Sequence, residues 1–337
     1  MLWGLEITRA CEERLSGLHA GGSVLAPVHR SLGQEAGPVG CAHALRVATD
    51  GTGDVLAPSV RGAGALFALG LTPVEYFRHF LGTASSPNGG RDADLEISAL
   101  DRGWLGSIAP LGTMVSVMAG VALSFKLKGE ARVAMAFCGD GATSTGAWHE
   151  GLAVAAAGDC PFVLVIEANR WSLSTRTRFQ TRLHTFAAKA RGYGIVGESV
   201  DGNDVEAVRE AAGRAVSSAR TGAGPRLLEL RTYRRSGHTE EDSVDYVPAH
   251  ELEEWARRDP LLRYRRALVD EGLGTRKEVE AVGLAAKEAA VEGERLALED
   301  AVPEGEEALR GVLGDQHSAA PWPRSERTPP GLEARDS

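Results

Sequence analysis

The 337-residue sequence lacks an excess of positive charge, and this absence excludes two classes of partner. Its formal net charge is −9 at neutral pH. Nucleic acids and anionic membranes attract proteins through a basic face, which this composition does not favour. We therefore expect neither a nucleic acid nor a membrane among its partners.

Long hydrophobic runs and paired cysteines are also absent. Charged residues interrupt the apolar stretch at residues 1–9, which argues against a signal peptide, and no other stretch is long and apolar enough to span a membrane. The four cysteines form neither a CxxC pair nor a Cys/His cluster: Cys11, Cys41, Cys138 and Cys160. This usage is typical of reduced, buried cysteines in a cytoplasmic protein. The sequence also shows no internal repeat and no nucleotide-binding P-loop.

The sequence does contain a large apolar fraction and one clear β-α-β pattern. Hydrophobic residues make up 43% of the chain, enough for the core of a large α/β protein. Residues 133–138 and 162–166 are short apolar runs typical of parallel strands buried on both faces. Residues 146–157 have helical spacing and many alanines. The pattern predicts two parallel strands joined by a right-handed helical crossover.

Polar residues follow both predicted strands directly. Asp140 comes after the first strand and Asn169 after the second. Open parallel sheets bind ligands at the carboxyl ends of their strands, and carboxylate and amide oxygens suit Mg²⁺. Gly139 and Gly141 allow a phosphate to approach the backbone, and the N–H groups that open the next helix are anion donors. The sequence therefore predicts a site for Mg²⁺ and a diphosphate.

These residues also carry a family resemblance. Gly139-Asp140-Gly141, followed by a helix, a strand and Asn169, resembles the thiamine-diphosphate motif. The Trp-His-Glu-Gly-Leu segment at 148–152 resembles the α subunit of the E1 component of 2-oxoacid dehydrogenase complexes of the pyruvate and branched-chain type. The resemblance covers residues 30–270 and implies a thiamine-diphosphate-binding α/β fold, with a mainly parallel sheet flanked by helices.

The resemblance also implies ligands for the metal and for the cofactor. The metal ligands would be Asp140, Asn169 and the main-chain carbonyl of Trp171. Ala168 stands where the family usually has a further Asn, but the expected ligand Asn169 is present. The cofactor would contact a set of residues spread along the chain: Arg61, Leu111, Gly139, Asp140, Gly141, Ala142, Asn169 and His238. Among these, Arg61 would bind the diphosphate and Leu111 would shape the bent cofactor.

The segment at 232–246 resembles a family loop whose His reaches the diphosphate and the reacting centre. His238 matches that position and is the predicted catalytic residue. Three positions depart from the family pattern: Val60 replaces a Tyr, while Glu96 and Ser236 each stand where a His is found in other members. The acidic end of the segment is more similar to branched-chain members.

The remaining pattern predicts further elements around this site. Expected helices span 2–20, 31–44, 110–128, 183–193, 204–220, 261–271 and 277–298, and an expected strand spans 226–231. The helix at 31–44 contains Gln34 and Glu35 and resembles the family's opening helix. Residues 83–107 are rich in Gly, Ser and Asp and are expected to form a mobile loop at the site entrance.

The sequence thus predicts one thiamine-diphosphate-binding domain at residues 1–312, with a helical extension at 248–312 and a disordered tail at 313–337. The resemblance implies a cytoplasmic oxidoreductase that decarboxylates a small 2-oxo acid and passes the acyl group to a lipoyl disulfide on an E2 core. The chain is too short for the family's second cofactor domain, so an E1 β subunit is expected, in an α₂β₂ heterotetramer. The Glu that activates the cofactor in this family lies on that β subunit.

Two alternatives stay open. The chain could be the N-terminal half of a split transketolase, although Gln34, Glu35 and the His238 loop argue against this. It could also be a catalytically silent E1-like subunit, given the departures at Val60, Glu96 and Ser236. The sequence does not distinguish pyruvate, branched-chain 2-oxo acids and acetoin as substrates.

Overall fold

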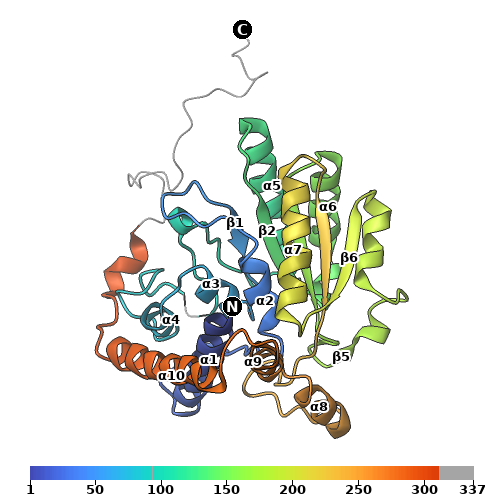
Figure 1. The fold of residues 1–337 in the computed structure, drawn as a ribbon. Helices are drawn as coiled ribbons and strands as arrows, with labels where there is room; N and C mark the ends of the chain where they lie inside the picture. The colour runs from blue at the N-terminus through green and yellow to red at the C-terminus, as the bar shows by residue number, and fades with distance from the viewer. Residues whose placement is uncertain (93, 311–337) are drawn as a thin grey trace.

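The computed structural model describes residues 1–92 and 94–310, and its centre is a five-stranded sheet (Figure 1). The strand order is β1-β2-β3-β7-β6, and every neighbouring pair is parallel. The strands are β1 (Val55–Ala57), β2 (Ala134–Gly139), β3 (Phe162–Ala168), β6 (Val196–Asp201) and β7 (Arg226–Arg231). This confirms the α/β class with a parallel sheet. The predicted tail at 313–337 and residues 311–312 lie outside the described residues.

Helices cover both faces of the sheet because the central strands are apolar on both faces. The helices packed there are α2 (Ala36–Ala42), α5 (Thr113–Lys128), α6 (Gly146–Ala157) and α7 (Val205–Arg220). Met135 and Val163 join a buried cluster with residues of α2 and α7. Ala134 and Phe162 join a second cluster with residues of α5 and α6. Successive strand residues therefore alternate between two cores, as the pleat requires.

Shorter and C-terminal helices surround this centre. They are α1 (Leu2–Ala20), α3 (Ala63–Ala68), α4 (Pro73–Phe80), α8 (Ala249–Ala256), α9 (Pro260–Asp270) and α10 (Arg276–Leu298). Helix α10 packs against α1 and α4, so the end of the described chain closes over its beginning (Figure 1). Short 3₁₀ turns complete the chain at Leu100–Arg102, Asp140–Ser144, Thr177–Phe179, Phe186–Tyr193 and Gly305–Leu309.

Most predicted elements are present within one residue at each end. These are the helices expected at 2–20, 146–157, 204–220, 261–271 and 277–298, and the strand at 226–231. The strands expected at 133–138 and 162–166 form β2 and β3, the second of which continues to Ala168. Residues 83–107 are largely irregular, as expected.

The helix expected at 31–44 is shorter than predicted. Residues 31–35 form a turn, and α2 begins at Ala36. Gly33 has a φ of +87°, which a right-handed helix cannot include. The Ser31 hydroxyl donates to Glu12 at 2.7 Å and so ties the turn to α1.

Two other predicted helices also differ. The helix expected at 110–128 begins at Thr113, because Gly112 has a φ of +80°. The helix expected at 183–193 is a 3₁₀ segment, Phe186–Tyr193.

Strands β1 and β6 have no counterpart among the sequence predictions. Strand β1 has only three residues, and β6 is an edge strand whose first two residues are exposed. Neither forms the long apolar run that marks a buried strand. A two-stranded antiparallel pair, β4 (Trp171–Ser172) and β5 (Thr175–Arg176), follows β3 directly and was also not predicted.

The four cysteines are buried and free, as expected. Among the described residues, the model contains no helix that combines the length and apolarity needed to cross a bilayer.

Candidate active site at the carboxyl edge of the sheet

A cavity of about 330 Å³ lies where β2 and β3 end. It is lined by every residue that the sequence assigned to the cofactor, the metal or catalysis: Arg61, Leu111, Gly139, Asp140, Gly141, Ala142, Asn169, Trp171 and His238. These residues come from five separate parts of the chain, so the fold brings the predicted set together in one place. The cavity size is in the range of small-molecule sites.

Asp140 lies at the end of β2 and is 1% exposed. Its Oδ1 accepts the N–H of Gly141 at 2.8 Å, and its Oδ2 accepts from Thr177 at 3.1 Å and from Gln180 at 3.3 Å. Burial raises the pKa of Asp140, although these hydrogen bonds act against the shift. The described residues place no Lys or Arg within ion-pair distance of it. The carboxylate is therefore buried in a polar setting without a direct ion pair, and the charge of Arg234 favours its ionised form only at longer range.

Asn169 is held at the end of β3 by a sharp change of chain direction. Arg170 has a φ of +73°, and the chain then turns into β4. The Trp171 N–H donates to Asn169 Oδ1 at 3.3 Å, while Asn169 Nδ2 donates to Gln34 Oε1 at 3.2 Å. The Trp171 ring is buried and donates to the Tyr233 hydroxyl at 3.1 Å. The ring therefore packs, as expected, and Asn169 lines the same cavity as Asp140.

The donor set fits a hard cation such as Mg²⁺. The described residues contain no group of three or more His, Cys, Asp or Glu side chains that could hold a metal. A site here would instead combine the Asp140 carboxylate, the Asn169 amide oxygen and a main-chain carbonyl, leaving positions for phosphate oxygens and water. That mixture of oxygen donors suits Mg²⁺ better than softer metals.

Two buried guanidinium groups line the cavity. Arg61 is 6% exposed and donates to the main-chain oxygen of His238 at 2.6 Å. Arg234 is 1% exposed and donates to the main-chain oxygen of Leu173 at 2.9 Å. In both guanidinium groups the buried Nε has no hydrogen-bond partner among the described residues. Burial, followed by the charge of Arg234, lowers the pKa of Arg61 to about 10. Unsatisfied cationic donors at a cavity wall fit an anionic ligand such as a diphosphate.

Glu167 is a buried carboxyl group on the same wall. It lies on β3, is 3% exposed and accepts the Ser59 hydroxyl at 2.5 Å through Oε2. Its Oε1 has no partner among the described residues, and burial raises the pKa of Glu167. Sequence reasoning missed both Glu167 and Arg234. The available signal was an ionisable residue inside, or just after, an apolar strand.

His238 is half-buried at the cavity and packs edge-on against His29, with 5.1 Å between the ring centroids. The main-chain N–H of His238 donates to Asp242 Oδ2 at 2.7 Å, and this hydrogen bond fixes the backbone of the loop. Burial, and then the charges of Arg61, His29 and Arg234, lower the pKa of His238 to about 4. In the ligand-free protein its imidazole is therefore neutral at pH 7.

The positions that depart from the family pattern fall in different places. Val60 lines the cavity, whereas Glu96 and Ser236 do not. A hydrogen bond with Asp92, with burial, raises the pKa of Glu96 to about 7. Among the described residues of the loop at 83–107, which is expected at the site entrance, only Ser107 lines the cavity.

Comparison with known proteins extends over most of the chain. A family model described as "Dehydrogenase E1 component" matches residues 5–303. The chain is 36% identical to the α subunit of acetoin:2,6-dichlorophenolindophenol oxidoreductase from Cupriavidus necator, over 81% of each chain. It is 37% identical to the α subunit of 3-methyl-2-oxobutanoate dehydrogenase from Mycobacterium tuberculosis, over 76% of this chain and 66% of that one. It is 28% identical to the α subunit of the pyruvate dehydrogenase E1 component from Rhizobium meliloti, over 91% of this chain and 87% of that one.

Proposed function

The chain belongs to the dehydrogenase E1 component family as an α-type subunit, and from this premise we propose that it binds thiamine diphosphate and Mg²⁺ in the cavity at the carboxyl edge of the sheet. The proposed reaction is the oxidative decarboxylation of a small 2-oxo acid, with acyl transfer to the lipoyl disulfide of an E2 core. The single observation that carries the proposal is the meeting of oxygen donors and unsatisfied guanidinium groups in one cavity.

Each wall of the cavity has a separate role in this proposal. Asp140 and Asn169 would hold Mg²⁺ through oxygen atoms, and Arg61 and Arg234 would neutralise the diphosphate. Leu111, Ile108 and Met114 supply an apolar wall, and a partner subunit placed against it would exclude water from the reacting part of the site. When bound, the cofactor supplies a thiazolium ring that accepts the electrons released on decarboxylation.

His238 is the residue proposed to act in proton transfer. A neutral imidazole can accept a proton, whereas an imidazolium cannot. The low pKa of His238 keeps the ring neutral until an anionic ligand arrives at the same wall. Because Arg61 donates to the His238 main-chain oxygen, Arg61 links the proposed diphosphate site to the segment that bears the catalytic candidate.

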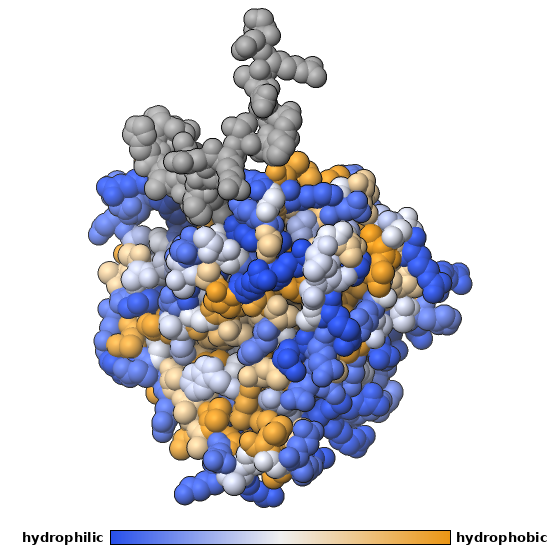
Figure 2. All heavy atoms as spheres, turned by 45° about the horizontal axis from the view of Figure 1, so that its top comes forward, coloured by the Kyte–Doolittle hydropathy of each residue, from blue (hydrophilic) through white to orange (hydrophobic). Residues whose placement is uncertain are grey.

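A second subunit is proposed to complete this cavity. Leu111, at the cavity, is 63% exposed, and Leu173, also at the cavity, is 60% exposed. On the face that Figure 2 draws, away from the strand ends that border the cavity, hydrophobic side chains also gather in patches between charged regions. Large exposed apolar side chains beside a binding site favour a protein partner. We infer an E1 β subunit in an α₂β₂ assembly located in the cytoplasm, with the cofactor-activating Glu on the β chain.

The test is reconstitution with the β subunit. The purified complex is assayed with pyruvate, branched-chain 2-oxo acids and acetoin, using an artificial electron acceptor and then lipoyl-E2. We expect 2-oxo acid decarboxylation that requires thiamine diphosphate and Mg²⁺, and no activity from the isolated chain. Activity of the isolated chain would refute the two-subunit site, and turnover of acetoin alone would correct the substrate class.

The same experiment addresses the alternatives. The family match and the named relatives favour an E1 α subunit over the split transketolase half. A catalytically silent subunit would support neither cofactor binding nor turnover in the reconstituted complex. Direct binding of thiamine diphosphate therefore separates the silent subunit from the proposed enzyme.

A further inference from the structure

Two contacts fix the orientation of the Asn169 amide. The Trp171 N–H requires the amide oxygen on its own side, and Gln34 Oε1 requires the amide nitrogen on the other side. Both Asn169 and Gln34 are almost fully buried, at 6% and 1% exposed. If the Asn169 amide alone were reversed, its oxygen would face the Gln34 oxygen, and if both amides were reversed, the Trp171 N–H would face the Asn169 nitrogen. Gln34 therefore favours the orientation in which Asn169 Oδ1 lies beside Trp171.

The backbone of Gln34 is itself held by the turn at residues 31–35. Its N–H donates to the Ser31 main-chain oxygen at 2.8 Å, and the Gly33 N–H donates to Glu35 Oε2 at 2.9 Å. Gly33 has a φ of +87°, and a Cβ atom there would lie 2.5 Å from Arg235 Cδ. The turn thus depends on glycine, both for its backbone conformation and for its close contact with Arg235.

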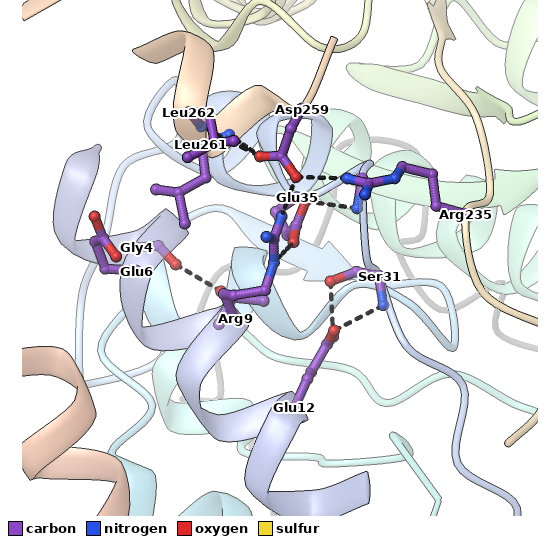
Figure 3. A network of polar contacts seen from close by, with 12 residues as sticks. Gly4, Glu6, Arg9, Glu12, Ser31, Glu35, Arg235, Asp259, Leu261 and Leu262 are labelled. Carbon is purple, nitrogen blue, oxygen red and sulfur yellow. Dashed lines mark hydrogen bonds and ion pairs between the residues drawn. The ribbon is translucent and has the colours of Figure 1, made fainter. Parts of the chain in front are cut away.

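A charged network anchors this turn (Figure 3). Arg9 Nε from α1 donates to Glu35 Oε1 at 2.5 Å, and Arg9 Nη2 donates to Asp259 Oδ2 at 3.1 Å. Arg235 Nη1 donates to the same Asp259 oxygen at 2.6 Å. Asp259 also caps the N-terminus of α9. The network ties the turn to α1, to α9 and to the segment that leads into His238.

We propose that Gln34 is a positioning residue that presents the Oδ1 of Asn169 to Mg²⁺. The inference rests on the proposed function, because Asn169 is a metal ligand only within that function. A side-chain amide binds a cation through its oxygen. An amide that can rotate therefore presents its nitrogen to the cation part of the time. Residues that orient metal ligands by hydrogen bonds typically contribute about 10- to 100-fold to metal affinity.

The test compares two substitutions of Gln34 in the complex with the β subunit. Gln34→Leu keeps the approximate size and removes the acceptor, whereas Gln34→Glu keeps an oxygen that accepts from Asn169 Nδ2. Binding of Mn²⁺ in the presence of thiamine diphosphate is measured by electron paramagnetic resonance. We expect Gln34→Leu to weaken Mn²⁺ binding by about 10- to 100-fold and Gln34→Glu to stay close to the wild type. Saturating Mn²⁺ should restore cofactor affinity in Gln34→Leu.

Ser31→Ala is the matched control in the same turn. It removes the hydroxyl that donates to Glu12 but leaves the Gln34–Asn169 contact, so we expect a lower melting temperature with unchanged Mn²⁺ affinity. Equal Mn²⁺ affinity in folded Gln34→Leu and wild type would overturn the inference, as would an equal loss in Ser31→Ala. A wild-type complex that binds neither Mn²⁺ nor thiamine diphosphate would instead refute the proposed function.

Discussion

Two regions of the molecule contain buried charges that are compensated in different ways. In the network beneath the turn at 31–35, Glu35 pairs with Arg9, and Asp259 pairs with both Arg9 and Arg235. In the cavity, Asp140 and Glu167 have only hydrogen-bond partners among the described residues. The first region is complete without a ligand, and the second is not.

The pKa directions follow the same division for Asp259, Asp140 and Glu167, whereas Glu12, which accepts from Ser31 in the turn, is buried without an ion pair among the described residues and burial raises its pKa to about 8. Burial acts against the ionised form of Asp259, but Arg9 and Arg235 outweigh it, and the pKa of Asp259 is lowered. Burial raises the pKa of Asp140 and of Glu167, and no adjacent cation reverses the shift. An uncompensated buried charge costs stability and is typical of functional sites, where a ligand supplies the missing partner. The comparison therefore separates structural charges from charges kept for binding.

The largest expected effect comes from Asp140→Asn, which removes a proposed metal ligand. We expect the complex to lose saturable Mg²⁺-dependent binding of thiamine diphosphate, measured by calorimetry. Because the folded state disfavours the ionised Asp140, the ligand-free variant should melt at the same or a higher temperature near pH 7. Asn169→Ala should also abolish metal-dependent binding, and full cofactor affinity in either variant would refute the metal assignment.

Asp259→Asn is the opposite case, because its charge belongs to the paired network. The substitution leaves Arg9 and Arg235 without their shared carboxylate, and removing one partner of a buried ion pair costs about 3 kcal/mol. We expect a clear drop in melting temperature in the ligand-free protein. A control substitution at the exposed pair of Arg295 and Glu292 should change it little. Similar melting of Asp259→Asn and wild type would contradict the division between the two regions.

His238→Ala tests the catalytic side of the cavity. We expect the lipoyl-dependent rate to fall by about 10²-fold, the usual scale for a lost acid or base group. Decarboxylation with an artificial acceptor should fall less, and excess thiamine diphosphate should not restore the lipoyl-dependent rate. If both rates fall together and recover with excess cofactor, His238 serves mainly the diphosphate. Unchanged rates in both assays would exclude a catalytic role.

Only part of the cavity could be predicted from the local sequence pattern. Asp140 and Asn169 follow two apolar runs directly, so the pattern alone predicts that they meet at one edge of the sheet. Arg61 and His238 lie in irregular segments, and only the family resemblance identified them. Glu167 was not predicted, because its role depends on burial, which the local sequence pattern does not reveal.

Prediction of the secondary-structure elements from local sequence pattern has the same limit. Helix α7 has strong apolar periodicity and helix α6 is rich in alanine, and both were predicted closely, whereas β6 is a polar edge strand without an apolar run. The turn at 31–35 was predicted as helix because its conformation depends on Gly33 and on contacts with distant residues. Long-range pairing therefore decides the features that local pattern misses.

The smallest expected effect is a pH dependence that comes from His238. Its folded pKa is about 4, below the ordinary value of 6.5, because burial and nearby cations disfavour the imidazolium. Between these two values the unfolded chain binds a proton that the folded chain does not, so this group's contribution to stability is present above pH 6.5 and is lost as the pH falls toward 4.

His238→Asn removes that contribution from the ligand-free protein. We expect the melting temperature of the variant, relative to wild type, to rise steadily as the pH is lowered from 7.5 to about 4.5, measured by calorimetric scans. The effect should be modest because the ring is half-exposed, and the other histidines cancel because both proteins contain them. A melting difference that stays constant over this range would show that His238 is protonated as readily in the folded protein as in the unfolded chain. Burial and the cations at the cavity wall would then have no effect on the protonation of His238.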